Sequence, residues 1–569
     1  MKTGNTLQPN IVLILTDDQG WGDLGYTGNT SISTPNIDRL AREGAIMERF
    51  YVQPLCAPTR AEILTGRCFP RTGVHGVTRG QERMNLDEVT VAQVLKTAGY
   101  ATGCFGKWHN GSAYPYHPNG RGFDEFYGFC CGHWSDYFQS TIERNGEEVV
   151  APGYLPDACT DEAMAFIERN RDRPFFCYLP LNIPHSPFQV PDRYWDRLKD
   201  LDLPQRATDA AKEKLSETRA ALAMCENIDW NVGRVVGKLN ELGLAAQTIV
   251  IYLSDNGPNT HRWNGGMRGI KGSIDEGGVR SPCSFTWPGR IAPGTRVGHV
   301  AGSIDFLPTL ADFAGVKDAK TKPLDGVSLR SLLEGRAEEW PDRAIFAQSI
   351  NFRYTSMRTA RYRACVGGDA LYDMVDDFRQ TRDLAAERPD EWRRQRGEIE
   401  RWRTEMLPEG GMRPLRIPVG YREFPTTSLR PEDGDPHGAI TWSSIHPNSS
   451  FLTNWRDGAD SVSWELDVAN EGEYDVTLHY TCKPENVGAG IEAVCGAARV
   501  GCTVTEAFDP PLRTGEDRSP RDSSYMKPFK TLALGRLRLK AGQQTIELRA
   551  TKKAGAEMID VGELRLRLL

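Results

Sequence analysis

Residues 54–67 combine a thiol, an arginine and an apolar helical run in one short segment, PLCAPTRAEILTGR. Pro58 suits the first position of a helix, where its missing N–H is not needed. Cys56 would then lie just before a helix N-terminus, where free amides favour an anion. Arg60 would lie one turn into the helix, where its planar guanidinium can bind a sulfuryl or phosphoryl group. The alternative is a buried cysteine beside a helix-starting proline.

Acidic and amide side chains directly follow two of the predicted strands. Asp17 and Asp18 follow a strand at 11–15, and Asp255 and Asn256 follow another at 248–253. Hard cations such as calcium prefer several oxygen ligands of this kind. Either pair alone is more typical of a turn. Two pairs at the edge of one sheet favour a metal site.

Three further segments carry lysine or histidine side chains after a strand or in a glycine-rich loop. They read GKWH, IPHSP and GIKG followed by EGGVR, and they contain Lys107, His109, His185 and Lys271. Any one of these side chains alone is more often a surface or packing residue. Their common position beyond strand ends, where α/β sheets bind ligands, indicates a single site.

Taken in order along the chain, these motifs resemble those of the type I, formylglycine-dependent sulfatases of the alkaline-phosphatase-like superfamily. The family signature C-x-P-S-R matches at Cys56, except that Thr59 replaces the serine with another hydroxyl residue. SDNG at 254–257 matches the family's metal motif, and SIDFLPTL at 303–310 fits its pattern. The resemblance implies that a formylglycine-generating enzyme converts Cys56 to formylglycine. It also implies a calcium ion held by Asp17, Asp18, Cys56 (as formylglycine), Asp255 and Asn256.

The resemblance further implies hydrolysis of a sulfate ester. Hydrated formylglycine, activated by Asp255, would attack sulfur and form a covalent sulfo-enzyme. His185, with Lys271, would protonate or stabilise the leaving alkoxide, and His109 would accept the proton that accompanies release of sulfate. The implied catalytic set is Cys56, Arg60, Lys107, His109, His185, Asp255 and Lys271.

The bulk composition is ordinary for a soluble globular protein, with 39% hydrophobic and 25% charged residues in 569. The net charge of −7 and the lack of a basic run give no support to nucleic-acid binding. No stretch is apolar enough to span a membrane. The thirteen cysteines are scattered, and Cys482, Cys495 and Cys502 permit a local disulfide without requiring one.

The N-terminal residues 1–9 are polar and do not have the pattern of a secretory signal. We therefore expect a cytoplasmic protein if Met1 is the native start. If a signal peptide has been removed, we expect a periplasmic or secreted one.

Alternating strands and helices predict an α/β domain over residues 1–335, with a mainly parallel central sheet flanked by helices. Residues 336–415 indicate a smaller α/β subdomain, and the Pro- and Gly-containing stretch 416–436 indicates a linker. Period-two alternation over residues 437–569 predicts a C-terminal β-sandwich. The clearest predicted elements are strands at 11–15, 101–105, 175–179 and 248–253, and helices at 34–43, 89–98, 158–170, 211–242 and 391–406.

Candidate substrate residues lie in loops near the motifs and mix aromatic with polar side chains. An ordinary loop role is at least as common for any one of them. They are His75, Arg79, His133, Trp134, Asp136, His261, Arg262 and Trp263. The sandwich weakly resembles carbohydrate-binding modules, and its Trp442, Trp455 and Trp464 are either ligand-binding or core residues. These features favour a carbohydrate sulfate over a simple aryl sulfate.

Two other functions stay open. Relatives with the same aldehyde handle related anions, so the chain could be a phosphonate or phosphate ester hydrolase on the same scaffold. It could also be a non-catalytic protein that binds sulfated glycans through an inactive sulfatase domain. The complete catalytic set argues against the second alternative, because an inactive site is expected to lose some of these residues.

Overall fold

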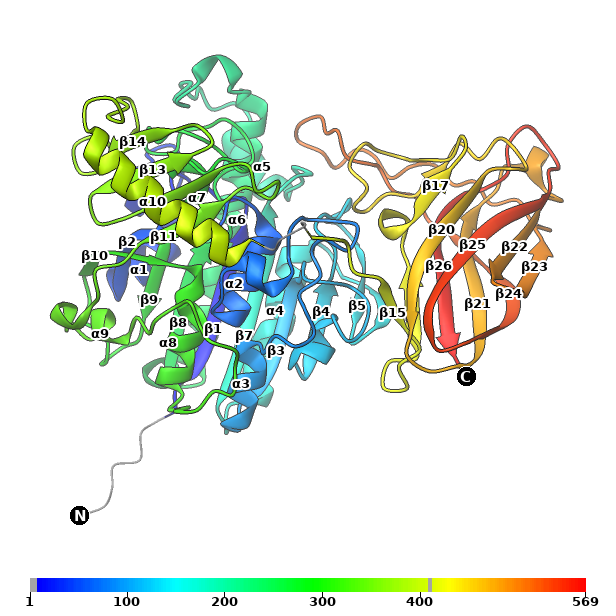
Figure 1. Cartoon of the computed structure of the whole chain (residues 1–569), viewed down its shortest axis with the longest axis horizontal. Coiled ribbons are helices and arrows are strands. Elements are labelled where there is room, and N and C mark those ends of the chain that lie inside the picture. The colour runs from blue at the N-terminus through cyan, green and yellow to red at the C-terminus, as the bar shows by residue number, and fades with distance from the viewer. Residues whose placement is uncertain (1–7, 408–411) are drawn as a thin grey trace.

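The computed structural model describes residues 8–407 and 412–569. Its larger body is built on a ten-stranded sheet in the order β10-β2-β9-β8-β1-β7-β3-β4-β5-β6 (Figure 1). The strands are β1 (Asn10–Asp17), β2 (Ala45–Tyr51), β3 (Ala101–Lys107), β4 (Glu125–Phe129), β5 (Thr141–Arg144), β6 (Glu147–Val150), β7 (Phe175–Pro184), β8 (Thr248–Ser254), β9 (Cys283–Thr286) and β10 (Thr295–Gly302). The central run β8-β1-β7-β3-β4 is parallel, whereas β9, β5 and β6 pair antiparallel. The α/β prediction is confirmed, with a mixed sheet around a parallel centre.

Helices cover both faces of this sheet, and strand β1 shows why its sequence is almost continuously apolar. Val12 and Ile14 pack with helices α1, α4 and α6 on one face, whereas Leu13 and Leu15 pack with α2, α3 and α8 on the other. A strand buried on both faces needs apolar residues at every position. The helices are α1 (Pro35–Arg42), α2 (Cys56–Thr65), α3 (Val91–Thr97), α4 (Leu155–Arg169), α5 (Asp192–Leu198), α6 (Leu215–Glu241), α7 (Glu276–Val279), α8 (Phe306–Phe313) and α9 (Arg330–Leu333).

Helix α2 begins two residues earlier than predicted. Cys56 is its first residue, so Pro58 stands third rather than first. The proline is tolerated there because none of the first N–H groups of a helix has an intrahelical acceptor. The correction places Cys56 inside the first turn instead of before it.

A small four-stranded antiparallel sheet follows, of β11 (Ile345–Gln348), β12 (Thr355–Arg358), β13 (Tyr362–Val366) and β14 (Ala370–Asp373). Helix α10 (Pro389–Met406) packs on it, with Phe346 and Trp402 stacked at 4.8 Å between ring centroids. This unit matches the subdomain predicted for 336–415, except that residues 408–411 lie outside the described residues.

The C-terminal region forms two packed sheets, in the orders β15-β20-β25-β22-β23 and β18-β19-β26-β21-β24 (yellow to red in Figure 1). Their strands are β15 (Ile417–Val419), β16 (Thr426–Leu429), β17 (Asp435–His437), β18 (Thr441–Trp442), β19 (Leu452–Thr453), β20 (Ser461–Val468), β21 (Gly472–Thr481), β22 (Gly490–Cys495), β23 (Ala498–Thr503), β24 (Lys530–Leu539), β25 (Gly542–Lys552) and β26 (Asp560–Leu568). Trp455 and Trp464 are buried in the core between the sheets. These two tryptophans therefore cannot form an exposed surface for sugar binding.

The prediction of a linker at 416–436 is wrong. This stretch supplies β15 and β17, which pair with β20, and β16, which pairs with β26. Proline is compatible with short strands at a sheet edge, where one N–H faces away from the ladder. The sandwich thus begins at about residue 417.

All thirteen cysteines lie within the described residues and are free thiols. The local disulfide that the sequence permits among Cys482, Cys495 and Cys502 is not formed. Among the described residues, no helix has the length and apolarity to cross a bilayer.

Candidate active site

The predicted catalytic and metal residues meet at one edge of the central sheet. Asp17 ends β1, Lys107 ends β3, His185 follows β7 and Asp255 follows β8. These four strands are parallel neighbours, so their carboxyl ends lie side by side. Helix α2 brings Cys56 to the same edge.

Oxygen and sulfur atoms crowd at the centre of this site. One ligand atom each from Asp17, Cys56 and Asp255 lies within 4.8 Å of the other two. Asn256 donates from Nδ2 to Asp18 Oδ1 at 2.8 Å, and its buried Oδ1 has no hydrogen-bond partner among the described residues. A buried amide oxygen without a donor, beside carboxylates, fits a hard cation that takes oxygen ligands. The residues present therefore suit calcium.

Three cationic side chains face the three carboxylates. Lys107 Nζ lies 2.9 Å from Asp17 Oδ2, and Lys271 Nζ lies 2.7 Å from Asp18 Oδ1. Arg60 is completely buried and donates from Nε and Nη2 to Asp255 Oδ2, at 3.1 and 2.8 Å. With the charges balanced, a divalent cation would leave a net positive site suited to a sulfate ester.

Burial and these neighbours shift the acidities in the site. Burial, together with nearby Asp17, raises the pKa of Asp255 to about 7. Burial works in the same direction on Asp17, but the charges of Lys107, His185, Arg60 and Lys271 together outweigh it and hold the pKa of Asp17 well below its ordinary value. Burial also raises the pKa of the Cys56 thiol. An unmodified Cys56 is therefore a poor nucleophile, because the thiolate is the reactive form.

Thr59, which replaces the serine of the family signature, supports the loop before α2. Its Oγ1 accepts from the backbone N–H of Gln53 at 2.9 Å, and the side chain is fully buried. A serine hydroxyl could make the same bond. The departure from the signature therefore keeps the hydrogen bond that the position makes.

His109 is held in one orientation by a backbone carbonyl. Its Nε2 lies 2.8 Å from Val77 O, and its buried Nδ1 has no partner among the described residues. A carbonyl only accepts, so Nε2 carries the proton and Nδ1 presents a lone pair. Burial and the nearby Lys107 lower the pKa of His109 well below its usual value. Both features suit a base.

His185 and Lys271 lie together on Asp18. His185 Nε2 is 3.6 Å from Asp18 Oδ2, and its Nδ1 lies 2.6 Å from Ser186 O. Burial and Lys271 lower the pKa of His185. Burial also acts to lower the pKa of Lys271, but Asp18, Cys56 and Asp17 together outweigh it and raise that pKa. Lys271 therefore stays protonated, and His185 can donate a proton only as the imidazolium, through Nε2.

Comparison with known proteins decides the family. The family model described as Sulfatase matches residues 9–316. N-acetylgalactosamine-6-sulfatase of Sus scrofa is 34% identical over 380 residues, which cover 60% of this chain and 69% of that protein. Arylsulfatase A of Homo sapiens is 35% identical over 409 residues, covering 63% of this chain and 74% of that protein. The chain belongs to the sulfatase family.

A solved structure gives the same answer for the fold. The structure of Ps i-CgsB in complex with k-i-k-neocarrahexaose superposes with a TM-score of 0.64 at 29% sequence identity. The match covers 71% of this chain and 95% of that one. The family prediction is confirmed, and the protein is a sulfatase, an enzyme that hydrolyses sulfate esters.

The predicted substrate residues of the sulfatase domain differ in their surroundings. His133 is buried beside His185, with 5.5 Å between ring centroids, and its Nε2 has no partner among the described residues. Trp134 stacks on Phe129 at 5.1 Å. Arg79 instead forms an ion pair with Asp435 of the sandwich. The remaining partly exposed members of the set are His75, Asp136, His261 and Trp263.

Burial raises the pKa of Asp136 to about 6, so this carboxyl can hold a proton near neutrality. Arg513 Nη1 of the sandwich lies 3.9 Å from it. Asp136 therefore lies at the contact between the two domains rather than at the sulfate-binding centre.

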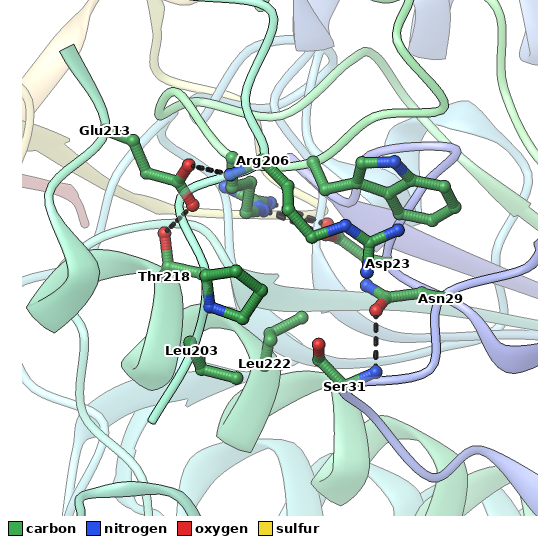
Figure 2. A pocket seen from close by; sticks show the side chains of 11 residues that line it. Asp23, Asn29, Ser31, Leu203, Arg206, Glu213, Thr218 and Leu222 are labelled. Carbon is green, nitrogen blue, oxygen red and sulfur yellow. Dashed lines mark hydrogen bonds and ion pairs between the residues drawn. The ribbon is translucent and has the colours of Figure 1, made fainter. Parts of the chain in front are cut away.

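The prediction that Arg262 contacts substrate is wrong. Its guanidinium donates to Asp23 from Nε and Nη2, to Thr260 Oγ1 from Nη1 and to Asp18 O from Nη2, so its donors are occupied. Arg262 instead holds the loop that carries Asp18. Asp23 lines a small cavity of about 20 Å³ together with Arg206, Glu213 and Thr218 (Figure 2).

A larger cavity of about 320 Å³ was not predicted from the sequence. It lies between the loop that follows Lys271 and the small subdomain, and its lining includes Arg268, Tyr354 and Tyr372. Arg268 Nη1 donates to the Tyr372 hydroxyl at 2.9 Å. No motif marks these residues, because they come from separate segments that only the folded chain brings together.

Proposed function

We propose that this sulfatase removes a sulfate group from a sulfated carbohydrate, using formylglycine made from Cys56 and a bound calcium ion. The observation that carries the proposal is the position of Cys56. It opens helix α2 in direct reach of Asp17 and Asp255, inside a cluster that also holds Arg60. Such a centre can bind the sulfuryl oxygens and place a nucleophile beside sulfur.

Asp17, Asp18, Asp255 and Asn256, with residue 56, would hold the calcium ion. The ion supplies positive charge that polarises the sulfate ester, and hydrated formylglycine supplies one hydroxyl for attack and a second for release of sulfate. Asp255, which lies within reach of residue 56, can accept the proton of the attacking hydroxyl. Arg60 and Lys107 bind the charge on the sulfuryl oxygens.

Two sets of side chains transfer the other protons of the reaction. Lys271, with the imidazolium form of His185, donates to the leaving oxygen through Nζ or Nε2. His109 accepts a proton at Nδ1 when sulfate departs. His109 is buried, which excludes water from it and strengthens its interactions, whereas His185 and Lys271 are partly exposed.

A carbohydrate leaving group is supported by the surroundings of the site. The 320 Å³ cavity beside the Lys271 loop offers two tyrosine rings and a guanidinium, the mixture of apolar faces and few polar groups found in ligand pockets. The pig relative is named for a sulfated amino sugar, and the structural neighbour holds a neocarrahexaose.

The first test is the mass of the tryptic peptide 50–60 from protein made together with a maturation enzyme. We expect a peptide lighter than its thiol form and reactive towards an aldehyde probe. An unmodified thiol would contradict the proposed cofactor.

The second test compares turnover of the matured protein on matched aryl sulfate and aryl phosphonate esters, and on sulfated oligosaccharides. We expect kcat/KM to be highest for a sulfated oligosaccharide. Preference for the phosphonate would support the alternative hydrolase. Binding of the oligosaccharide without cleavage would support the non-catalytic protein.

A further inference from the structure

One loop of the sandwich reaches into the active-site region. Residues 443–451 connect β18 and β19, and Asn448 lies near the tip of this loop. Its Nδ2 donates to Val77 O at 3.1 Å, and its Oδ1 accepts from Thr78 Oγ1 at 2.8 Å. The adjacent Ser449 is bonded to Ser135, whose Oγ donates to Ser449 O at 3.0 Å. The sandwich therefore holds two loops of the sulfatase domain at once.

The carbonyl that Asn448 binds is also the partner of His109. Val77 O receives both the Asn448 amide and the His109 Nε2–H, at 3.1 and 2.8 Å. The two donors lie side by side against Gly132. A Cβ atom at that position would lie 2.4 Å from His109 Nε2 and 2.8 Å from Asn448 Nδ2. Only glycine leaves room for both.

His109 needs such support, because its backbone is in the left-handed region with φ +65°. A residue other than glycine keeps this conformation only when its surroundings impose it. The backbone N–H of His109 donates to Cys130 O at 3.1 Å, and the ring is fixed by Val77. The position of the Val77 carbonyl thus decides which ring nitrogen carries the proton.

We propose that Asn448 of the sandwich is a positioning residue for His109. By holding Val77 and Thr78, it keeps His109 in the tautomer with a proton on Nε2 and a lone pair on Nδ1. When sulfate is released, the proton goes to Nδ1, and the resulting imidazolium still donates from Nε2 to Val77 O. The inference rests on the proposed role of His109 as the base of that step.

The sandwich is then a part of the catalytic site rather than a separable binding module. Loss of the loop 443–451 would affect every substrate, small or polymeric. A module that only binds carbohydrate would affect polymeric substrates alone.

The first experiment measures the tautomer directly and needs neither formylglycine nor calcium. The full-length chain with unconverted Cys56 is labelled with ¹⁵N-histidine, and the His109 signals are assigned by their loss in His109→Gln. We expect the Nε2–H tautomer in the parent protein and a shift towards a mixture in Asn448→Ala and in Thr78→Val. Asn470→Ala is the matched control, because its amide donates to Gly420 O at 2.8 Å within the sandwich.

The second experiment follows an aryl sulfate with matured protein before and after the first turnover. In Asn448→Ala we expect a normal first release of the aryl alcohol, equal in amount to the enzyme. Steady-state turnover should then be slower by about 10- to 100-fold, because only the proton transfer to His109 is misaligned. A general folding defect would reduce the first turnover as well.

Two outcomes would overturn the inference. One is an unchanged His109 tautomer in both Asn448→Ala and Thr78→Val. The other is steady-state turnover of both variants within about two-fold of the parent protein, well inside the loss expected from a misplaced base. If the matured parent protein cleaves no sulfate ester, the proposed function fails, but the tautomer measurement still decides the role of Asn448.

Discussion

The two ends of the active site are held in different ways. At the sulfate-binding end, Asp17, Lys107 and Asp255 come from the ends of β1, β3 and β8. They are buried in ion pairs, Asp17 with Lys107 and Asp255 with Arg60. At the other end, around the base and the leaving group, His109 and His133 lie in loops whose neighbours are bonded to the sandwich. The sheet therefore fixes the chemistry of the sulfate group, whereas a second domain shapes the region around the base and the leaving group.

This difference suggests how the substrate can change while the reaction is kept. Strand ends are rigid, because each strand is bonded on both sides. Loops tolerate change far better and carry most specificity. A change in a sandwich loop can thus alter the leaving-group end without disturbing the ion pairs at the sheet edge.

The largest expected effect lies at the sulfate-binding end. Cys56→Ser provides a hydroxyl that can attack sulfur but lacks the second hydroxyl needed for release. We expect steady-state turnover to fall on the order of 10³-fold or more. Mass spectrometry of peptide 50–60 should show one added sulfuryl group on the serine.

The control for this variant is Cys68→Ser, another buried cysteine, which lies beyond the C-terminus of α2. It should show no sulfuryl adduct. Sustained turnover by Cys56→Ser would contradict the role given to residue 56.

The next prediction tests the contact between the sulfatase domain and the sandwich, where two arginines of one loop pair with two aspartates of the sandwich. Arg83 and Asp433 are buried, with Nη2 and Oδ2 2.8 Å apart, whereas Arg79 and Asp435 are exposed. Arg83→Ala leaves a buried carboxylate unpaired and should lower the free energy of unfolding by about 3–5 kcal/mol. Arg79→Ala should lower it by about 0–1 kcal/mol.

Denaturant unfolding followed by tryptophan fluorescence measures both values. If the two variants lose equal stability, the buried pair does not fasten the sandwich to the sulfatase domain. The leaving-group end would then not depend on this contact.

The sheet-edge residues could be predicted from sequence because each follows an apolar strand directly. Parallel topology then brings Asp17, Lys107 and Asp255 together, regardless of the conformation of the loops. The contact of Asn448 could not be predicted, since it meets Val77, 371 residues away, and its acceptor is a backbone carbonyl without a side-chain signature. Arg262 looked available because sequence does not show that Asp23 uses its donors.

The same limit explains the error over residues 416–436. Proline and glycine are frequent in linkers and also in short edge strands. Only the pairing partners, β20 and β26, distinguish the two, and they lie far along the chain. The period-two pattern of 461–468 has no such ambiguity, and this stretch forms β20.

An effect smaller than that of Arg83→Ala is expected from calcium, which stabilises the sulfate-binding end alone. A ligand that binds only the folded state at 100 times its Kd stabilises by about 2.7 kcal/mol. Calcium added to the unconverted protein should therefore raise Tm, and chelation should reverse the change.

Asn256→Ala removes the amide oxygen that has no donor and should abolish most of the response. Asn231→Ala removes a buried amide of α6, bonded to Asp157, and should keep it. An equal rise in Tm for both variants would show that calcium binds elsewhere, and the sheet edge would then need its three cations alone to hold the sulfate.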